Sequence, residues 1–165
     1  WDFYMTTNDV LRRIRIVFDM NDAKMIELFS HVEHTVTRAQ IGAWLKNDDD
    51  PTYVDCTDTE LAMFLNGLIV EKRGRKEGPL PEPESELTNN IIFMKLKIAL
   101  NLQAGEVLEI LQSVDFWLSK HELSAFFRKP GHKHFRECKD QALRNFLNGL
   151  HAKYRDNSNA RAKAN

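Results

Sequence analysis

An internal repeat at an offset of 82 residues constrains the fold of this chain more than any other feature. The pentapeptide Phe-Leu-Asn-Gly-Leu occupies residues 64–68 and returns unchanged at residues 146–150. Residues 8–74 align without a gap to residues 90–156, and many aligned pairs are identical or chemically alike, for example Asn8/Asn90, Cys56/Cys138, Trp44/Phe126 and Tyr53/Phe135. A match of this length indicates two copies of one supersecondary unit of about 67 residues.

Four helices are predicted in each repeat, because apolar residues recur at spacings of three and four after helix-starting residues. In the first repeat those starting residues lie at 8–9, 21–22, 37–40 and 57–58. The third boundary is the clearest. Thr37 with Gln40 forms a capping box, and Ser119 with Glu122 repeats it at the equivalent place.

The sequence therefore predicts an all-α protein of two tandem, similar four-helix repeats, packed together with a pseudo-two-fold relation. One repeat alone has a marginal core, which favours packing of the two. The predicted segments are a first repeat at 5–74, a Pro/Glu-rich solvated linker at 75–89, a second repeat at 90–156 and a frayed polar tail at 157–165. Residues 1–4 precede the repeat and are interpreted as an extension or as expression-derived.

The pentapeptide divides into core positions and two residues that need another explanation. Its Phe and Leu residues share one helix face with Leu61 and are predicted to be core. Asn66 and Gly67 point away from that face, and glycine inside a helix costs about 1 kcal/mol relative to alanine. We interpret Gly67 and Gly149 as points of close backbone approach, with Asn66 and Asn148 hydrogen-bonding across the contact. Packing of the two fourth helices on each other would place Gly67 near Gly149; the alternative is that the asparagines line a ligand groove.

Charge is divided unequally between the repeats. The first repeat has eight Lys and Arg against twelve acids, a net charge of −4, and the second has eleven against seven, a net charge of +4. One interpretation is electrostatic complementarity between the repeats or between chains. The other is a polyanion site on the second repeat.

Nucleic-acid binding is the first alternative function. Residues 23–46 resemble a stretched helix-turn-helix, in which the capped third helix offers Arg38 and Gln40. In the second repeat the corresponding segment offers Lys120, His121, Arg128 and Lys129. The turn at 31–36 is longer than that of the motif and lacks glycine, and the acidic first repeat opposes phosphate binding. The prediction therefore applies to the second repeat.

A metal- or thiol-dependent enzyme is the second alternative. His132, His134 and Cys138 are weak metal candidates, with His121 as a further ligand, but a solvated basic loop and no cofactor are the preferred interpretation. The two cysteines are expected to be free, buried thiols in a reducing cytoplasm. No Walker loop, HExxH or GxSxG motif is present. No apolar run of membrane-spanning length and no signal-peptide pattern occur, so we expect a cytoplasmic protein without a membrane partner.

A resemblance to a known family rests on four stretches, namely residues 8–15, the Ala-Trp-Leu-Lys of 43–46, residues 64–74 and residues 132–138. They resemble the bacterial YehS-like family of uncharacterised proteins, which is built from a duplicated domain of unknown function, and the resemblance covers Met5 to about Tyr154. It implies a bacterial, cytosolic, all-helical protein and supplies no catalytic residues. The leading prediction is a non-enzymatic binding or interaction module whose partner is another protein or a second copy of itself in a homodimer.

Overall fold

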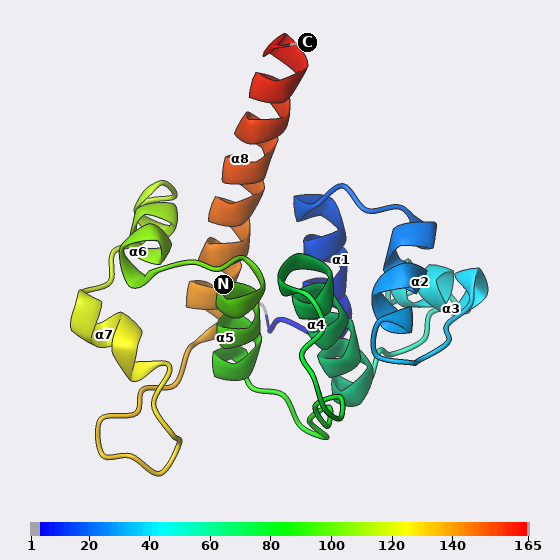
Figure 1. Cartoon of the computed structure of the whole chain (residues 1–165), viewed down its shortest axis with the longest axis horizontal. Coiled ribbons are helices and arrows are strands. Elements are labelled where there is room, and N and C mark those ends of the chain that lie inside the picture. The colour runs from blue at the N-terminus through cyan, green and yellow to red at the C-terminus, as the bar shows by residue number, and fades with distance from the viewer. Residues whose placement is uncertain (1–3, 165) are drawn as a thin grey trace.

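The computed structural model describes residues 4–164, with residues 156–161 described by their backbone alone. Within that range the chain is helical and contains no strand, as Figure 1 shows. The first repeat comprises α1 (Thr7–Val17), α2 (Asp22–Ser30), α3 (Arg38–Leu45) and α4 (Asp58–Arg73). The second comprises α5 (Asn89–Ala99), α6 (Ala104–Gln112), α7 (Lys120–Ala125) and α8 (Asp140–Ala164). The all-α prediction with two similar repeats is confirmed.

The helix starts follow from capping. Thr37 and Ser119 are the N-caps of α3 and α7, and both predicted capping boxes are present. Thr57 caps α4 in the same way with Glu60. Each box satisfies backbone N–H groups that a helix start leaves without an intrahelical partner.

The first identical pair of the repeat, Asn8 and Asn90, ties each first helix to the loop before its fourth helix. The Asn8 side-chain amide donates to the carbonyls of Trp44 and Val54 at 3.0 and 2.9 Å, and its oxygen accepts from the Cys56 N–H at 2.9 Å. Asn90 makes the three equivalent bonds in the second repeat. Each amide is buried with its hydrogen-bonding groups satisfied, as burial of a polar side chain requires.

The two repeats pack through their first and fourth helices. In each case the fourth helix of one repeat lies against the first helix of the other, α4 against α5 and α8 against α1 (Figure 1). Two hydrogen bonds cross between the repeats at equivalent places. The Met5 N–H donates to the Asp140 carboxylate at 2.9 Å, and the Leu87 N–H donates to the Asp58 carboxylate at 2.8 Å. Each fourth helix therefore holds the segment that enters the other repeat, which is the predicted pseudo-two-fold relation.

The linker and the tail differ from expectation. The linker is not wholly solvated, because Glu84 lies against the buried Lys95 of α5. The tail continues α8 as far as Ala164. Gly74 ends α4 with a φ of 85°, whereas the second repeat has Asp156 at that position and no glycine or proline thereafter. Alanine, arginine and lysine near the end of the chain favour continued helix.

Candidate binding groove between the two repeats

Gly67 and Gly149 lie where two helix backbones approach closely, but each contact is within its own repeat. A Cβ atom at Gly67 would lie 2.0 Å from the Leu28 carbonyl oxygen of α2. A Cβ atom at Gly149 would lie 2.6 Å from the Ile110 carbonyl oxygen of α6. The expectation that Gly67 and Gly149 approach each other is therefore wrong. Each fourth helix lies between the second helix of its own repeat and the first helix of the other repeat.

Asn66 and Asn148 instead reach across the repeats, each to a cation. The Lys95 ammonium donates to the Asn66 side-chain oxygen at 2.6 Å, and the Arg13 guanidinium donates to the Asn148 oxygen at 2.6 Å. Positions 13 and 95 are themselves equivalent in the repeat. The two bonds are thus one interaction made twice, in opposite directions across the pseudo-two-fold relation.

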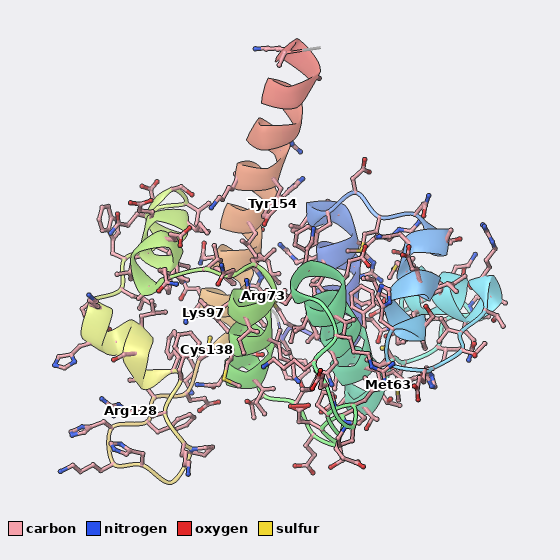
Figure 2. All side chains as sticks on the ribbon, in the orientation of Figure 1. Met63, Arg73, Lys97, Arg128, Cys138 and Tyr154 are labelled. Atoms are coloured by element: carbon pink, nitrogen blue, oxygen red, sulfur yellow. The ribbon has the colours of Figure 1, made fainter. Side chains whose placement is uncertain are left out.

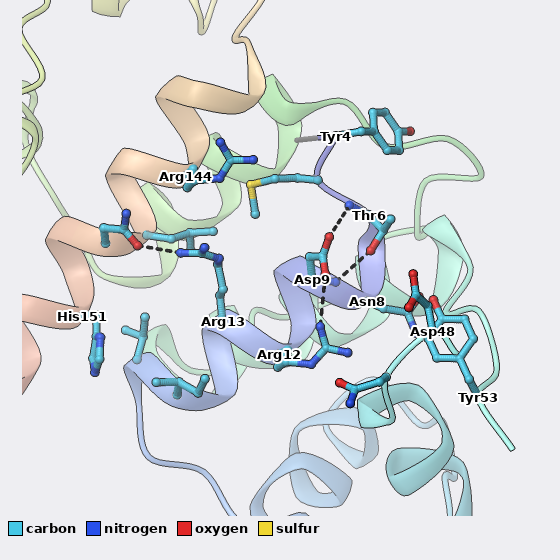
Figure 3. Close-up of a pocket in the computed structure, with 16 residues that line it drawn as sticks. Tyr4, Thr6, Asn8, Asp9, Arg12, Arg13, Asp48, Tyr53, Arg144 and His151 are labelled. Atoms are coloured by element: carbon cyan, nitrogen blue, oxygen red, sulfur yellow. Dashed lines mark hydrogen bonds and ion pairs between the residues drawn. The ribbon is translucent and has the colours of Figure 1, made fainter. Parts of the chain in front are cut away.

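The two equivalent contacts differ in how far they are closed. Between α4 and α5, Asn66 and Lys95 are only 4% and 8% exposed. The linker covers this contact and places a carboxylate oxygen of Glu84 3.1 Å from the Lys95 ammonium. At the contact between α1 and α8, Asn148 is exposed, and residues of both helices line a groove of about 760 Å³ (Figure 3).

Residue differences at equivalent positions explain the open groove. Arg144 and His151 of α8 line it, and their counterparts in α4 are Ala62 and Ile69. Asp9 and Arg12 of α1 have Ile91 and Met94 as counterparts in α5, and these apolar side chains line a second groove, of about 780 Å³. At positions 144 and 151, polar side chains that require solvation therefore replace a buried alanine and a partly buried isoleucine.

The charges in the groove fall into two groups. Arg12 is neutralised by Asp9 at 3.1 Å and also donates to the Lys46 carbonyl at 3.0 Å. Arg13 is partly buried and faces the groove beside Arg144, as Figure 3 shows. Burial lowers the pKa of Arg13, the positive charge of Arg144 lowers it further, and Asp9 opposes both.

This arrangement suits an anion. A guanidinium presents planar N–H donors that match carboxylate and phosphate oxygens, and Arg13 donates a hydrogen bond to the neutral amide of Asn148. Of the groove residues, sequence reasoning identified Asn148 and missed Arg13, Arg144 and His151. The sequence signal for these residues lies in the equivalent positions at which the two repeats differ. Those differences distinguish the polar contact between α1 and α8 from the apolar contact between α4 and α5.

The nucleic-acid candidates lie apart from this groove, on and after α7. Lys120, His121, Arg128 and Lys129 are all exposed. The helix itself has only six residues, and Glu122 within it forms an ion pair with Arg136. The structure therefore offers a basic loop beside a short helix, and nucleic-acid binding there stays a prediction.

The histidine and cysteine candidates are placed separately. His132 accepts a hydrogen bond from the His134 N–H through its Nδ1 at 3.0 Å in the exposed loop. Cys138 is buried inside the repeat (Figure 2), and burial raises the pKa of its thiol to about 12. The pKa of Cys56 is also raised to about 12 for the same reason. Such thiols are almost entirely protonated at neutral pH and are poor nucleophiles and ligands.

One other group among the described residues has metal-ligand character, namely Glu27, His31 and Glu71. The Lys24 ammonium already contacts Glu71 and lies 3.3 Å from Glu27. The hydrogen bond from Lys24, followed by that from His31, lowers the pKa of Glu71. The Lys24 ammonium therefore occupies the position that a metal ion would take between these carboxylates, and the cluster links α2 to α4.

A family model described as a protein of unknown function (DUF1456) matches the chain twice, over residues 7–74 and 89–156. The chain belongs to this family. It is 42% identical over 150 residues to the uncharacterised protein YehS of Escherichia coli strain K12, which covers 90% of this chain and 96% of that protein. No solved structure matches the chain. No helix among residues 4–164 is long and apolar enough to cross a membrane.

Proposed function

We propose that this member of the family is a non-enzymatic binding module that takes a small anionic ligand in the groove between α1 and α8. The observation that carries the proposal is the difference between the two equivalent cation sites. In the closed contact, Lys95 has both an asparagine oxygen and the carboxylate of Glu84. In the open contact, Arg13 has the asparagine oxygen and borders a groove.

The closed contact indicates which chemistry fits the open one. A carboxylate from the linker is the group that lies on Lys95, so an anion of similar size is the expected occupant beside Arg13. The positive charge of Arg144 acts on Arg13, so an anion beside Arg13 is attracted by two guanidinium groups. His151 adds an imidazole ring to the lining of the groove.

Isothermal titration calorimetry at low salt, with inorganic phosphate and with succinate as separate probes, tests this function. The two probes distinguish a phosphate ligand from a carboxylate ligand. We expect Arg13→Gln to weaken binding by about tenfold or more, since a hydrogen bond to a charged group contributes about 1.5–3 kcal/mol. The matched control is Arg73→Gln, which removes the same charge from the end of α4, outside the groove.

Two outcomes would overturn the proposal. One is that neither anion binds wild-type protein at millimolar concentration. The other is that Arg13→Gln and Arg73→Gln weaken binding equally, which would show diffuse charge rather than a site. Position 2, equivalent to Glu84, is also acidic and lies outside the described residues, so Asp2→Asn is included to reveal competition from the chain itself.

Nucleic-acid binding by the second repeat is a separate candidate, favoured by the exposed basic residues after α7. A gel-shift titration at low and moderate salt tests it. Binding that depends on salt and is lost in Arg128→Gln with Lys129→Gln would support this candidate, because phosphate contacts release counterions. The same assay on Arg13→Gln separates it from the groove.

A further inference from the structure

The loops that follow α3 and α7 are equivalent in the repeat but opposite in charge. The acidic end, residues 46–57, has one lysine and four aspartates, a net charge of −3. The basic end, residues 128–139, has five Lys and Arg and one glutamate, a net charge of +4. The charged side chains of both ends are exposed apart from Asp50, which is half-buried.

These two ends do not meet within the molecule. Figure 1 shows α3 at one end of the long axis and α7 with its loop at the other, and Arg128 stands at the periphery in Figure 2. The opposite charges of these two ends are therefore not neutralised by the packing of α4 on α5 or of α1 on α8. Complementarity of this kind is available only between separate molecules.

The acidic end has an exposed apolar side chain, and the basic end has a hollow. Val54 lies in the acidic end with 51% of its surface exposed, next to Asp55. The basic end has a hollow of about 380 Å³ beside Ala125, bordered by Arg128 and by the ion pair of Arg136 with Glu122. An exposed apolar side chain next to an acid thus has a counterpart in a hollow next to Arg128.

We propose that the basic end binds the acidic end of a second copy of this chain, with Val54 entering the hollow beside Ala125. A two-fold dimer through either end would bring like charges together, which opposes association. The pairing is therefore head-to-tail, and each single contact leaves one unused end on both of its molecules. Such a heterologous contact builds a ring or an open chain instead of stopping at two molecules.

Sedimentation velocity over a range of protein concentrations tests the proposal. At about 0.01 M salt, where the Debye length is about 30 Å, we expect species larger than a dimer that grow with concentration. At about 1 M salt, where it is about 3 Å, we expect the 19.2 kDa monomer. Wild-type protein that remains monomeric at low salt and high concentration would overturn the proposal.

Variants that neutralise the charge of one end give a sharper test, because a variant with one disabled end can bind only a molecule whose opposite end is intact. Asp49→Asn with Asp55→Asn disables the acidic end, and Lys129→Gln with Lys133→Gln disables the basic end. Each double variant alone is expected to be monomeric at low salt. An equimolar mixture is expected to form a one-to-one dimer and to stop there, since each variant contributes its intact end. Absence of the mixed dimer would refute head-to-tail pairing.

Two controls separate this proposal from the others. Circular dichroism of both double variants checks that these exposed substitutions leave the fold intact. Arg13→Gln should still associate, because Arg13 lies in the groove and not at either end. If wild-type protein stays monomeric yet binds duplex DNA, and Lys129→Gln with Lys133→Gln abolishes that binding, the basic end serves nucleic acid and self-association is excluded.

Discussion

Substitution of Gly67 by alanine gives the most direct test of how the first repeat is packed. The new Cβ atom would lie 2.0 Å from the Leu28 carbonyl oxygen and 2.7 Å from its carbon. A normal carbon–oxygen contact is about 3.3 Å, so α2 and α4 would have to separate by more than about 1 Å. Both clashing atoms are main chain, which means that no rotamer change relieves them.

The expected magnitude combines two opposing effects. Helix propensity favours alanine over glycine by about 1 kcal/mol. Overpacking a well-packed contact costs about 1–3 kcal/mol, and a rigid backbone neighbour places Gly67 at the upper end of that range. Gly67→Ala should therefore lower the free energy of unfolding by about 2 kcal/mol. Gly149→Ala should lower it less, because its nearest atoms lie at 2.6 Å and one of them is a side-chain methyl of Ile110.

Urea denaturation of each variant measures these values, provided that the m-value stays constant. Gly42→Ala is the matched control, since Gly42 lies inside α3 and a Cβ there meets nothing within 4 Å. It should stabilise the protein by up to about 1 kcal/mol through helix propensity alone. If Gly67→Ala proves as stable as Gly42→Ala, close packing of α4 on α2 is refuted.

Further predictions concern the asparagines, the thiols and the linker. Asn66→Ala should destabilise the protein by about 3 kcal/mol in thermal or urea unfolding, because it deprives the buried Lys95 ammonium of a partner. Asn148→Ala, at the exposed equivalent position, should cost under about 1 kcal/mol. Equal losses would contradict the asymmetry of the two contacts. Burial raises the pKa of Cys56 and Cys138 to about 12, so as the pH rises the thiols of the unfolded chain lose their protons before those of the folded protein. The free energy of unfolding should therefore keep its full value below about pH 9 and fall by about 3 kcal/mol by pH 10. Urea unfolding of the double alanine variant should show a smaller fall over this pH range. Glu84→Gln should destabilise by about 1–3 kcal/mol and raise the proteolytic sensitivity of the linker, and unchanged cleavage would show that the linker is not held by its ion pair.

Much of the fold could be predicted from the sequence because its signals are local. Capping residues such as Thr37 and Ser119 mark helix starts wherever the rest of the chain lies. The gapless self-match then extends each local prediction to the other repeat. The tail was mispredicted because small polar composition suggested fraying, while the decisive fact is that the second repeat lacks a glycine equivalent to Gly74.

The contact partners could not be predicted in the same way. Self-similarity identifies equivalent positions, but it does not say whether equivalent helices meet each other or exchange partners. Gly67 was correctly assigned to a close backbone approach, yet its neighbour is Leu28 rather than Gly149. Identical residues in the two repeats do not indicate Arg144 and His151, because the groove is lined by positions at which the two repeats differ.

The reciprocal bonds from Lys95 to Asn66 and from Arg13 to Asn148 have the geometry of a two-chain assembly. In such an assembly, residue i of one subunit meets residue j of the other, and the converse also holds. A homodimer of single repeats must carry the same surface at both extremities, because one gene encodes both subunits. Covalent fusion through the linker removes that restriction and lets each half mutate independently. An acidic and a basic extremity, and one sealed and one open contact, are differences that only a fused pair can inherit.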